Sequence, residues 1–338
     1  MIGSSQPKIV ALGGGTGLST MLRGLKKLTQ NITAIVAVTD DGGGSGMLRK
    51  DLGMLPPGDI RSCILALAEI EPLMAKLMQY RFDEGCLKGQ CFGNLFLAAM
   101  HGVSNSFDEA VQRVGDVLRV TGRVLPVTAD NAYIEAYLEN GDIIKGESNI
   151  TLSDKNAKIK RISIKPENVK PLPDVLKAIR EADIIVMGPG SLYTSIIPNI
   201  IVKGVADEIM RGGALLVYVC NIMTQPGETD GMDAYRHAAA ICEHAGGHII
   251  DYCIVNKQAM PDELLEQYIK DGAEPVQINK KDFTNIKLVE GNFVHIKNGH
   301  LRHDYNKLAA AVLKLCKTKY QPPRVWKYKT QPANTTDN

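Results

Sequence analysis

The 338-residue sequence contains no apolar run long enough to span a bilayer and no signal-peptide pattern at its start. It has no Cys-x-x-Cys pair, its seven cysteines are an odd number in mostly apolar surroundings, and its histidines are dispersed. The formal net charge of +2 is too small to indicate a nucleic-acid partner. We therefore expect a cytoplasmic protein with reduced thiols, and neither a membrane span nor a structural zinc site.

The overall composition, with 44% hydrophobic and 22% charged residues, is that of a folded globular protein. The length allows one large domain or two small ones. Strand and helix patterns alternate through most of the chain, so we predict one Rossmann-like domain at 8–318. Beyond it, Pro322-Pro323 and a Thr/Asn-rich end predict a flexible tail at 319–338, which carries basic residues around Trp326.

A glycine-rich unit near the N-terminus organises the rest of the chain. An apolar run at 9–12 leads into one loop, a helical stripe follows over 18–28, and a second apolar run at 32–38 leads into another loop. This is a βαβ unit, in which both loops leave the same end of neighbouring parallel strands. The unpaired N–H groups of a helix N-terminus and the missing Cβ atoms of glycine suit an anionic ligand. The first loop contains Gly13, Gly14, Gly15, Thr16 and Gly17, and the second contains Asp40, Asp41, Gly42 and Ser45.

The pattern after the second loop completes an α/β fold. Helices are predicted within 60–118, and an antiparallel β-hairpin insertion is predicted at about 122–165, where Asn140-Gly141 is a strong hairpin signal. Alternating strands and helices then resume. We predict a Rossmann-like open, mostly parallel sheet with helices on both faces, and nothing in the sequence of the insertion suggests chemistry.

Three later strands are predicted to end near residues 187, 219 and 255, each before a polar or glycine-rich loop. In an open parallel sheet, ligands bind outside the carboxyl ends of the strands. Because all these loops leave that edge, we expect a nucleotide-sized site there. These loops contribute Gly188, Pro189, Gly190, Ser191 and Thr194, and then Asn221, Thr224 and Gln225.

Asp40 and Asp41 place two carboxylates beside a flexible turn. With Asp59 they form a candidate Mg²⁺ site, since Mg²⁺ prefers oxygen ligands and bridges carboxylates to phosphates. The pair is also a candidate for a catalytic base. The alternative is that the two side chains cap a turn or pair with a nearby arginine. For Asp59 the alternative is to cap a helix that starts at Ile60.

Other polar residues leave several interpretations open. Arg61 falls in the first turn of that predicted helix, where a cation opposes the dipole, so we expect an anion beside it. Asn94 is either a helix cap or an amide that binds a base or sugar. Ser191 lacks the Gly-x-Ser-x-Gly pattern of a serine hydrolase. Leu18 replaces the third glycine of the dinucleotide fingerprint, which leaves NAD binding, or a tight turn without a ligand, as weaker alternatives.

Six stretches between about residues 8 and 310 form a specific set. They are Gly-Gly-Gly-Thr-Gly-Leu at 13–18, Thr-Asp-Asp-Gly-Gly at 39–43, Pro-Pro-Gly-Asp-Ile-Arg at 56–61, Gly-Asn-Leu at 93–95, Gly-Pro-Gly-Ser-Leu-Tyr-Thr-Ser at 188–195 and Met-Thr-Gln-Pro-Gly-Glu-Thr at 223–229. In this order they resemble the motifs of the YvcK-like family, the gluconeogenesis factors. That family belongs to the superfamily of the 2-phospho-L-lactate transferase of deazaflavin coenzyme synthesis.

The resemblance implies a protein that binds a nucleotide sugar such as UDP-N-acetylglucosamine or UDP-glucose. It also implies a role in cell shape and envelope synthesis during growth on gluconeogenic carbon. In the transferase branch, the same edge binds a nucleotide diphosphate donor with Mg²⁺ and passes on a phospholactyl group. By motif, phosphates would be contacted by two loops, 13–17 and 188–194. Beside them would lie three acids, Asp40, Asp41 and Asp59. The remaining cleft would be lined by Asn94 and residues 221–225.

The sequence departs from the family pattern at two places. Gln90 and Cys91 stand where a His-Ser pair is expected, and Gly44 and Met47 stand where Ser and Arg are expected. These changes remove a histidine and a cation beside the phosphate site, which weakens the case for catalysis. The convergent strand-end loops and the YvcK-like motifs make a UDP-sugar-binding regulator the leading hypothesis. A Mg²⁺-dependent transferase of the 2-phospho-L-lactate type is the alternative, and an NAD-binding protein is the second alternative. Partners that we consider beyond the nucleotide sugar are a second copy of the chain and an enzyme of envelope synthesis.

Overall fold

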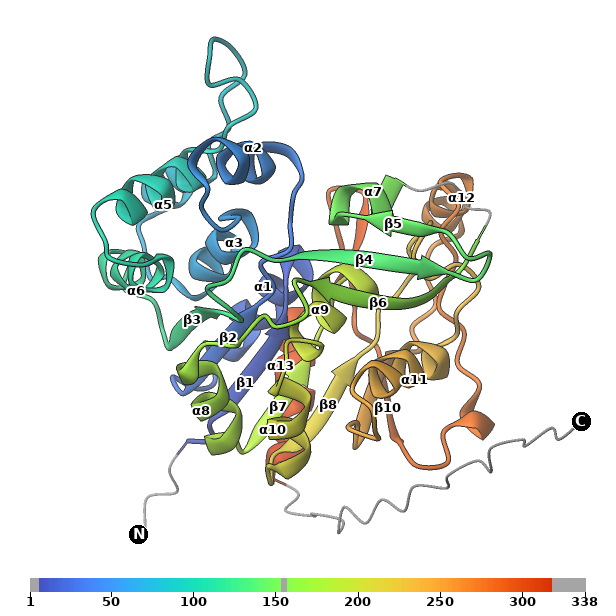
Figure 1. Cartoon of the computed structure of the whole chain (residues 1–338). Coiled ribbons are helices and arrows are strands. Elements are labelled where there is room, and N and C mark those ends of the chain that lie inside the picture. Colours follow the sequence, from blue (N-terminus) through green and yellow to red (C-terminus); the bar gives the residue numbers. More distant parts are fainter. Residues whose placement is uncertain (1–5, 153–156, 318–338) are drawn as a thin grey trace, which may run out of the picture.

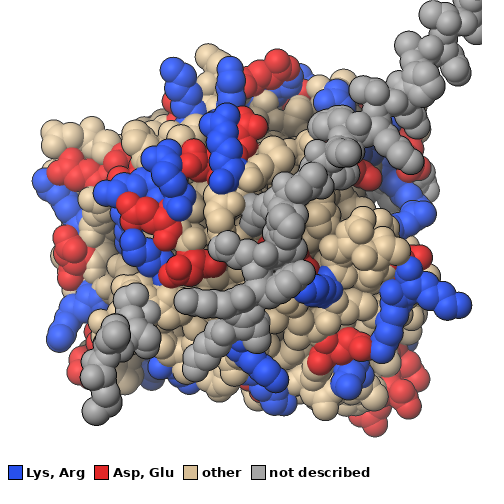
Figure 2. All heavy atoms as spheres, turned by 90° about the horizontal axis from the view of Figure 1, so that it is seen from below, with Lys and Arg blue, Asp and Glu red and all other residues tan. Residues whose placement is uncertain are grey.

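The structure is a computed structural model that describes residues 6–152 and 157–317 (Figure 1). The predicted tail at 319–338, with its basic residues around Trp326, lies outside the described residues. In the described part of the chain, no helix is both long and apolar enough to cross a membrane. On the face seen from below, the visible acidic and basic side chains are interspersed, so the described residues there form no extended area of one charge sign (Figure 2).

The centre of the molecule is a seven-stranded sheet in which all neighbouring strands are parallel. Its strand β1 (Ile9–Gly13) is buried along its whole length, as expected for an apolar run covered on both faces. The predicted open, parallel sheet is confirmed. The order is β10-β9-β8-β7-β1-β2-β3, with β2 at Ile32–Val36, β3 at Arg123–Pro126, β7 at Ile184–Met187, β8 at Leu215–Val219, β9 at Tyr252–Asn256 and β10 at Lys287–Gly291.

The strand order reverses between β1 and β7. After β1 the chain adds β2 and β3 on one side, and it then returns to build β7 to β10 on the other side. The loops that follow β1 and β7 therefore open on the two sides of a topological switch point. Doubly wound sheets bind their ligands at such a point.

Helices cover both faces of the sheet, as predicted (Figure 1). On one face α1 packs on α3 and α13, and on the other α8 packs on α10 and α9 on α11. The predicted helices within 60–118 correspond to α3, α4, α5 and α6, whereas the glycines at the start of α2 hide that helix from the hydrophobic pattern. The helices are α1 Gly15–Leu25, α2 Gly43–Leu52, α3 Gly58–Leu67, α4 Pro72–Gln79, α5 Phe92–Gly102, α6 Phe107–Val117, α7 Glu147–Leu152, α8 Pro173–Glu181, α9 Ile197–Ile200, α10 Val205–Arg211, α11 Ala234–His244, α12 Asp262–Lys270 and α13 Tyr305–Lys317, with a π-helix η1 at Leu192–Ile196 and a 3-10 helix η2 at Lys280–Asp282.

The antiparallel insertion is present but begins later than predicted. It consists of β4 (Tyr133–Leu138), β5 (Ile143–Lys145) and β6 (Ile159–Lys165) in the order β5-β4-β6. The prediction of 122–165 is wrong at its start, because β3 pairs in parallel with β2 in the main sheet. The short strand β3 shows three buried positions in a row, as parallel strands do, and not the alternation of a hairpin. A separate hairpin joins β11 (Val294–Lys297) to β12 (His300–His303).

Candidate functional site

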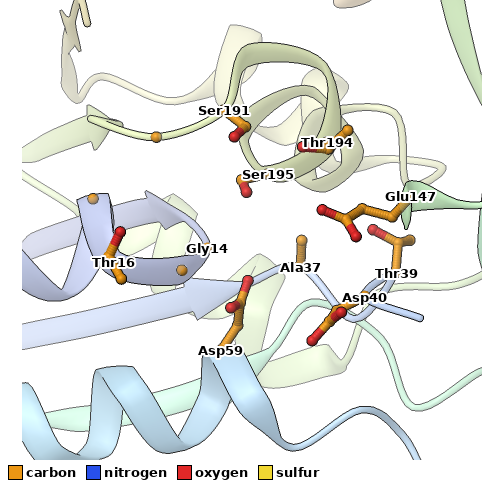
Figure 3. Close-up of a pocket in the computed structure, with 13 residues that line it drawn as sticks. Gly14, Thr16, Ala37, Thr39, Asp40, Asp59, Glu147, Ser191, Thr194 and Ser195 are labelled. Atoms are coloured by element: carbon orange, nitrogen blue, oxygen red, sulfur yellow. The ribbon is translucent and has the colours of Figure 1, made fainter. Parts of the chain in front are cut away.

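A cavity of about 240 Å³ lies at the carboxyl edge of the sheet, beside the switch point (Figure 3). Residues from the loops after β1, β2 and β7, from α3 and from the insertion line it. Two parts of this lining have different chemistry. We call the backbone-rich part, Gly14, Gly15, Thr16, Gly17 and Gly190, the glycine wall, and the part that carries the carboxylates, Thr39, Asp40, Asp59 and Glu147, the acidic wall; Asp59 lies where the two walls meet, against Gly14 and Gly15. Ala37, Ser191, Thr194 and Ser195 complete the lining.

The glycine wall is built from close backbone packing. Gly14 is the N-cap of α1, and Gly15 has a φ of +60°, which favours glycine. A Cβ on Gly14 would clash with the Asp59 carboxylate, and a Cβ on Gly17 would clash with the backbone of Pro189. The first-turn N–H groups of α1 have no intrahelical acceptor, so they are suited to bind an anion. Glycine at positions 14 and 17 therefore allows the backbone to pack against Asp59 and Pro189, and it also lets an anion approach the N–H groups of α1.

Asp59 does not cap its helix. The sequence predicts a helix start at Ile60, but α3 begins at Gly58 and Asp59 lies in its first turn. Its side chain instead crosses to the first glycine loop, where it accepts a hydrogen bond from the Gly15 backbone. Burial raises the pKa of Asp59 to about 7, the Asp40 charge adds to this, and the Gly15 bond opposes it. This carboxyl group therefore titrates near neutral pH inside the cavity.

The two adjacent carboxylates of the second loop point to different places. Asp40 lines the cavity, and its Oδ1 accepts a hydrogen bond of 2.9 Å from the Gly42 N–H. Asp41 is not part of the lining, and its Oδ1 accepts a hydrogen bond of 2.8 Å from the backbone N–H of Ser148, in α7. Arg49 contacts this loop through the Asp40 carbonyl oxygen, at 3.4 Å. Asp41 thus connects the second loop to the insertion.

Glu147 is a lining residue that the sequence reasoning misses. It begins α7, and the insertion brings it opposite the glycine wall (Figure 3). Burial raises its pKa to about 7, with further contributions from Asp40, Asp41 and Asp59. The insertion therefore contributes a carboxylate to the cavity lining, which its sequence pattern does not indicate. The available signal was Gly146-Glu147 directly after a strand, a glycine and an acid like those of the other loops.

Thr39 and Ser195 are also lining residues outside the predicted set. Thr39 is 2% exposed, and its hydroxyl has no hydrogen-bond partner among the described residues. Ser195 ends the predicted Gly-Pro-Gly-Ser-Leu-Tyr-Thr-Ser loop, so a prediction that included the whole motif would have found it. A further buried residue, Asn199, holds the glycine loop from behind by donating to the Gly13 carbonyl oxygen at 3.0 Å.

Asn221 and Gln225 stand behind the lining and position the loop after β7. The amide of Asn221 donates to the Gly190 carbonyl at 2.9 Å and accepts from the Gly190 N–H at 3.2 Å. This pairing uses the Gly190 N–H, which is then not available to a ligand. The Gln225 side chain accepts from the Ser191 hydroxyl at 2.8 Å. Both predicted residues are thus near the site without lining it.

Glu228 ends this hydrogen-bond network. One carboxylate oxygen accepts from the Gln225 amide at 2.7 Å and from the Thr194 hydroxyl at 3.3 Å. Its other oxygen, Oε2, is buried without a hydrogen-bond partner in the described part of the chain. Burial raises the pKa of Glu228 to about 7, and the charge of Glu147 adds to this.

Several predicted residues lie outside the cavity lining. Arg61 donates to the Asn94 side chain at 3.0 Å, so these two connect α3 to α5. Ser45 accepts from the Gly58 N–H at 3.1 Å, and Thr224 accepts from the Glu274 N–H at 2.8 Å. The predicted residues that the lining does not include are Gly13, Asp41, Gly42, Ser45, Arg61, Asn94, Gly188, Pro189, Asn221, Thr224 and Gln225; it does include Gly14, Gly15, Thr16, Gly17, Asp40, Asp59, Gly190, Ser191 and Thr194.

The lining carries three carboxylates and no lysine, arginine or histidine. Within residues 6–152 and 157–317, no three acidic, histidine or cysteine side chains are arranged to hold a metal ion by themselves. A Mg²⁺ ion at Asp40 and Asp59 would therefore need oxygens from phosphate or water to complete its shell, as Mg²⁺ commonly does. Without a cation, the acidic wall disfavours phosphate and favours groups that donate hydrogen bonds, such as hydroxyls.

Comparison with known proteins gives consistent matches over most of the chain. A family model described as "2-phospho-L-lactate transferase CofD" matches residues 9–294. A Thermoanaerobacterium thermosulfurigenes protein named "Putative gluconeogenesis factor" is 55% identical, covering 91% of this chain and 97% of that protein. A Bacillus subtilis protein named "Gluconeogenesis factor" is 44% identical, covering 92% and 99%. A crystal structure of a UPF0052 family member from Bacillus halodurans superimposes with a TM-score of 0.89 at 43% identity, covering 91% of this chain and 100% of that one.

Proposed function

The chain belongs to the 2-phospho-L-lactate transferase CofD family, and within it to the gluconeogenesis factors, and we propose that it is a regulatory protein that binds a nucleotide sugar of the UDP-sugar class. We further propose that this binding links the protein to cell shape and envelope synthesis during gluconeogenic growth. The names of the related proteins support the part of the second statement that concerns gluconeogenic growth. The motif resemblance supports the part that concerns cell shape and envelope synthesis. The cavity supports the first statement.

The observation that carries the proposal is the contrast between the two walls of the cavity. Apart from the Gly15 N–H, which is bonded to Asp59, the glycine wall offers first-turn backbone N–H groups of α1, which suit a phosphate. The acidic wall offers carboxylates, which accept hydrogen bonds from hydroxyls. A nucleotide sugar presents phosphate and hydroxyl groups side by side, so it matches both walls at once.

The size of the cavity limits which part of the ligand it encloses. At about 240 Å³ it is smaller than the roughly 300–1,000 Å³ of typical small-molecule sites. The cavity therefore holds the sugar and the adjoining phosphate in this proposal, and the nucleoside extends out of it.

The test is a thermal-shift panel on the full chain with UDP-N-acetylglucosamine, UDP-glucose, GDP, NAD and pyrophosphate, each with and without Mg²⁺. A ligand that binds only the folded state raises the melting temperature with its saturation. We expect a shift with UDP-sugars that does not require Mg²⁺. No shift with either UDP-sugar at millimolar concentration would contradict the proposal.

A Mg²⁺-dependent transferase is the second candidate. The concentration of carboxylates in a lining without cationic side chains favours it, as does the CofD family membership. Asp40 and Asp59 would hold the ion, which would neutralise phosphate charge during group transfer. In that case the thermal shift would require Mg²⁺ and would follow the diphosphate whatever the base, and turnover would be lost in Asp40→Asn.

A further inference from the structure

The insertion and the loop after β2 each contribute a polar side chain to the lining of the cavity, Glu147 and Thr39. We propose that Glu147 and Thr39 form a subsite that recognises one hydroxyl of the ligand's sugar, and that Asp41 positions Glu147 by holding the start of α7. This inference rests on the proposed function, because it assigns residues to the sugar of a bound nucleotide sugar. It changes the role of Asp41 from a candidate catalytic residue to a positioning residue.

Thr39 supplies the first half of the subsite. Its side chain lines the cavity, is only 2% exposed, and has no hydrogen-bond partner among the described residues. A buried polar group without a partner is unfavourable. Thr39 and Glu147 both line the cavity, and Figure 3 draws both on the side away from Gly14 and Thr16. A ligand oxygen placed on this side would satisfy the Thr39 hydroxyl.

Glu147 supplies the complementary half. A threonine hydroxyl can donate a hydrogen bond, and an ionised carboxylate can only accept one. One ligand group can pair with both side chains if it accepts from Thr39 and donates to ionised Glu147. A hydroxyl does both, whereas a phosphate oxygen only accepts and is repelled by the nearby Asp40 and Asp59 charges. The pair therefore selects a hydroxyl.

Asp41 fixes the position of Glu147 through the backbone on both sides of it. Its Oδ1 accepts from the Ser148 N–H at 2.8 Å. On the other side, Gly146 has a φ of +87°, and a Cβ there would clash with Asp41 Oδ2. The turn from Gly146 to Ser148 thus wraps closely around the Asp41 carboxylate. Loss of this contact removes a restraint on the backbone on both sides of Glu147.

Calorimetric titration of the full chain with UDP-glucose and with UDP tests the hydroxyl subsite. We expect the wild-type chain to bind UDP-glucose more tightly than UDP. In Glu147→Ala we expect this preference to fall about tenfold, the size expected for one hydrogen bond to a charged group, while UDP affinity stays the same. The matched control is Glu167→Ala, which removes an exposed glutamate just after β6 and should preserve the preference.

Each other outcome of this titration is decisive. An unchanged preference in Glu147→Ala would overturn the subsite, and so would an equal loss of affinity for UDP and UDP-glucose. If the wild-type chain binds neither UDP-glucose nor UDP-N-acetylglucosamine, the proposed function itself fails, and the inference fails with it.

A pair of substitutions at Asp41 tests the positioning role. Asparagine keeps an oxygen that can accept from the Ser148 N–H, and Asn and Asp are about equally good at such positions. We therefore expect Asp41→Asn to retain the wild-type preference for UDP-glucose, and Asp41→Ala to lose it as Glu147→Ala does. Thermal melts of both variants establish that they are folded. If Asp41→Asn lost the preference for UDP-glucose over UDP as fully as Asp41→Ala, the charge of Asp41 would be needed, and the positioning role would be overturned.

Discussion

The two walls of the cavity are held in place by different means. The glycine wall lies between adjacent strands of the main sheet, and its backbone packs so closely on Pro189 and Asp59 that side chains are excluded at Gly14 and Gly17. In the acidic wall, Glu147 depends on the insertion, where a hydrogen bond between Asp41 and Ser148 joins segments 107 residues apart. The site thus combines a wall held by close backbone packing with a side chain, Glu147, that the insertion brings to it.

The largest effect is expected from breaking the glycine wall with Gly17→Ala. The new Cβ would meet the Pro189 backbone, which cannot move away as a flexible side chain could. We expect a loss of about 3 kcal/mol in the free energy of unfolding, measured by urea denaturation. Gly102→Ala is the control, because nothing lies within 4 Å of its Cβ and it is also helical. Equal stabilities of the two variants would contradict the close packing.

The next effect concerns Glu228, buried behind the loop after β7. Its folded-state pKa of about 7 lies above the ordinary 4.5, so the folded chain holds more protons than the unfolded chain between these values. Protonated Glu228 therefore contributes to the free energy of unfolding at pH 4.5, and this contribution is lost as the pH rises through 7. We expect the unfolding free energy of the wild-type chain to fall between pH 5 and 8. In Glu228→Gln this fall should be smaller by roughly 2 kcal/mol. In the control variant Glu84→Gln, at an exposed position, the unfolding free energy should fall with pH as much as in the wild type.

The acidic wall can be disturbed alone by Gly146→Ala. Gly146 has a φ of +87°, and its Cβ would clash with Asp41, whereas Gly141 has a similar φ of +93° with open space around it. Both alanine variants carry a backbone cost of about 1 kcal/mol. We expect only Gly146→Ala to weaken UDP-glucose binding as well, about tenfold by calorimetry. If Gly141→Ala weakened binding to the same extent, strain in the insertion would explain the effect without Asp41.

The smallest effect is expected at a second attachment of the insertion. His244 in α11 accepts a hydrogen bond of 2.9 Å from the Ile162 N–H of β6, so that ring nitrogen must be unprotonated. Burial lowers the pKa of His244 below its ordinary 6.5, partly opposed by bonding to the Ala240 carbonyl. Neutral His244 therefore contributes to the free energy of unfolding above pH 6.5, and this contribution is lost as the pH falls below that value.

Urea denaturation at pH 7.5 and 5.5 checks this prediction. The free energy of unfolding of His244→Gln should be about 0.5–1 kcal/mol below that of the wild type at pH 7.5, and the difference should be smaller at pH 5.5. His300→Gln, at an exposed position in β12, is the matched control and should show no such difference. A pH-independent loss in His244→Gln would assign the effect to packing instead of protonation.

Sequence patterns predict those parts of the molecule whose structure is decided locally. The apolar run of β1, the glycine loop before α1 and the Asn140-Gly141 turn each carry their own signal, and each is found in the structure. Gly14, Thr16 and Asp40 were placed at the sheet edge because parallel strands bring their loops together there. The glycine wall is accordingly the predictable half of the site.

The remaining parts depend on tertiary contacts that no local pattern encodes. Whether β3 joins the main sheet depends on its partner β2, and its sequence reads equally well as part of a hairpin. Asp40 and Asp41 are neighbours in sequence, yet only the fold decides that one faces the cavity and the other holds Ser148. Glu147 was missed for the same reason, since α7 reaches the site only through the folded insertion.

The most direct test of the central claim is a calorimetric titration of the full chain with UDP-N-acetylglucosamine, with and without Mg²⁺. The account predicts saturable binding at one site, of similar affinity in both conditions and tighter than that of UDP. Absence of binding at millimolar concentration, or binding of sugar nucleotide and free UDP with equal affinity, would contradict the claim that the cavity recognises a nucleotide sugar.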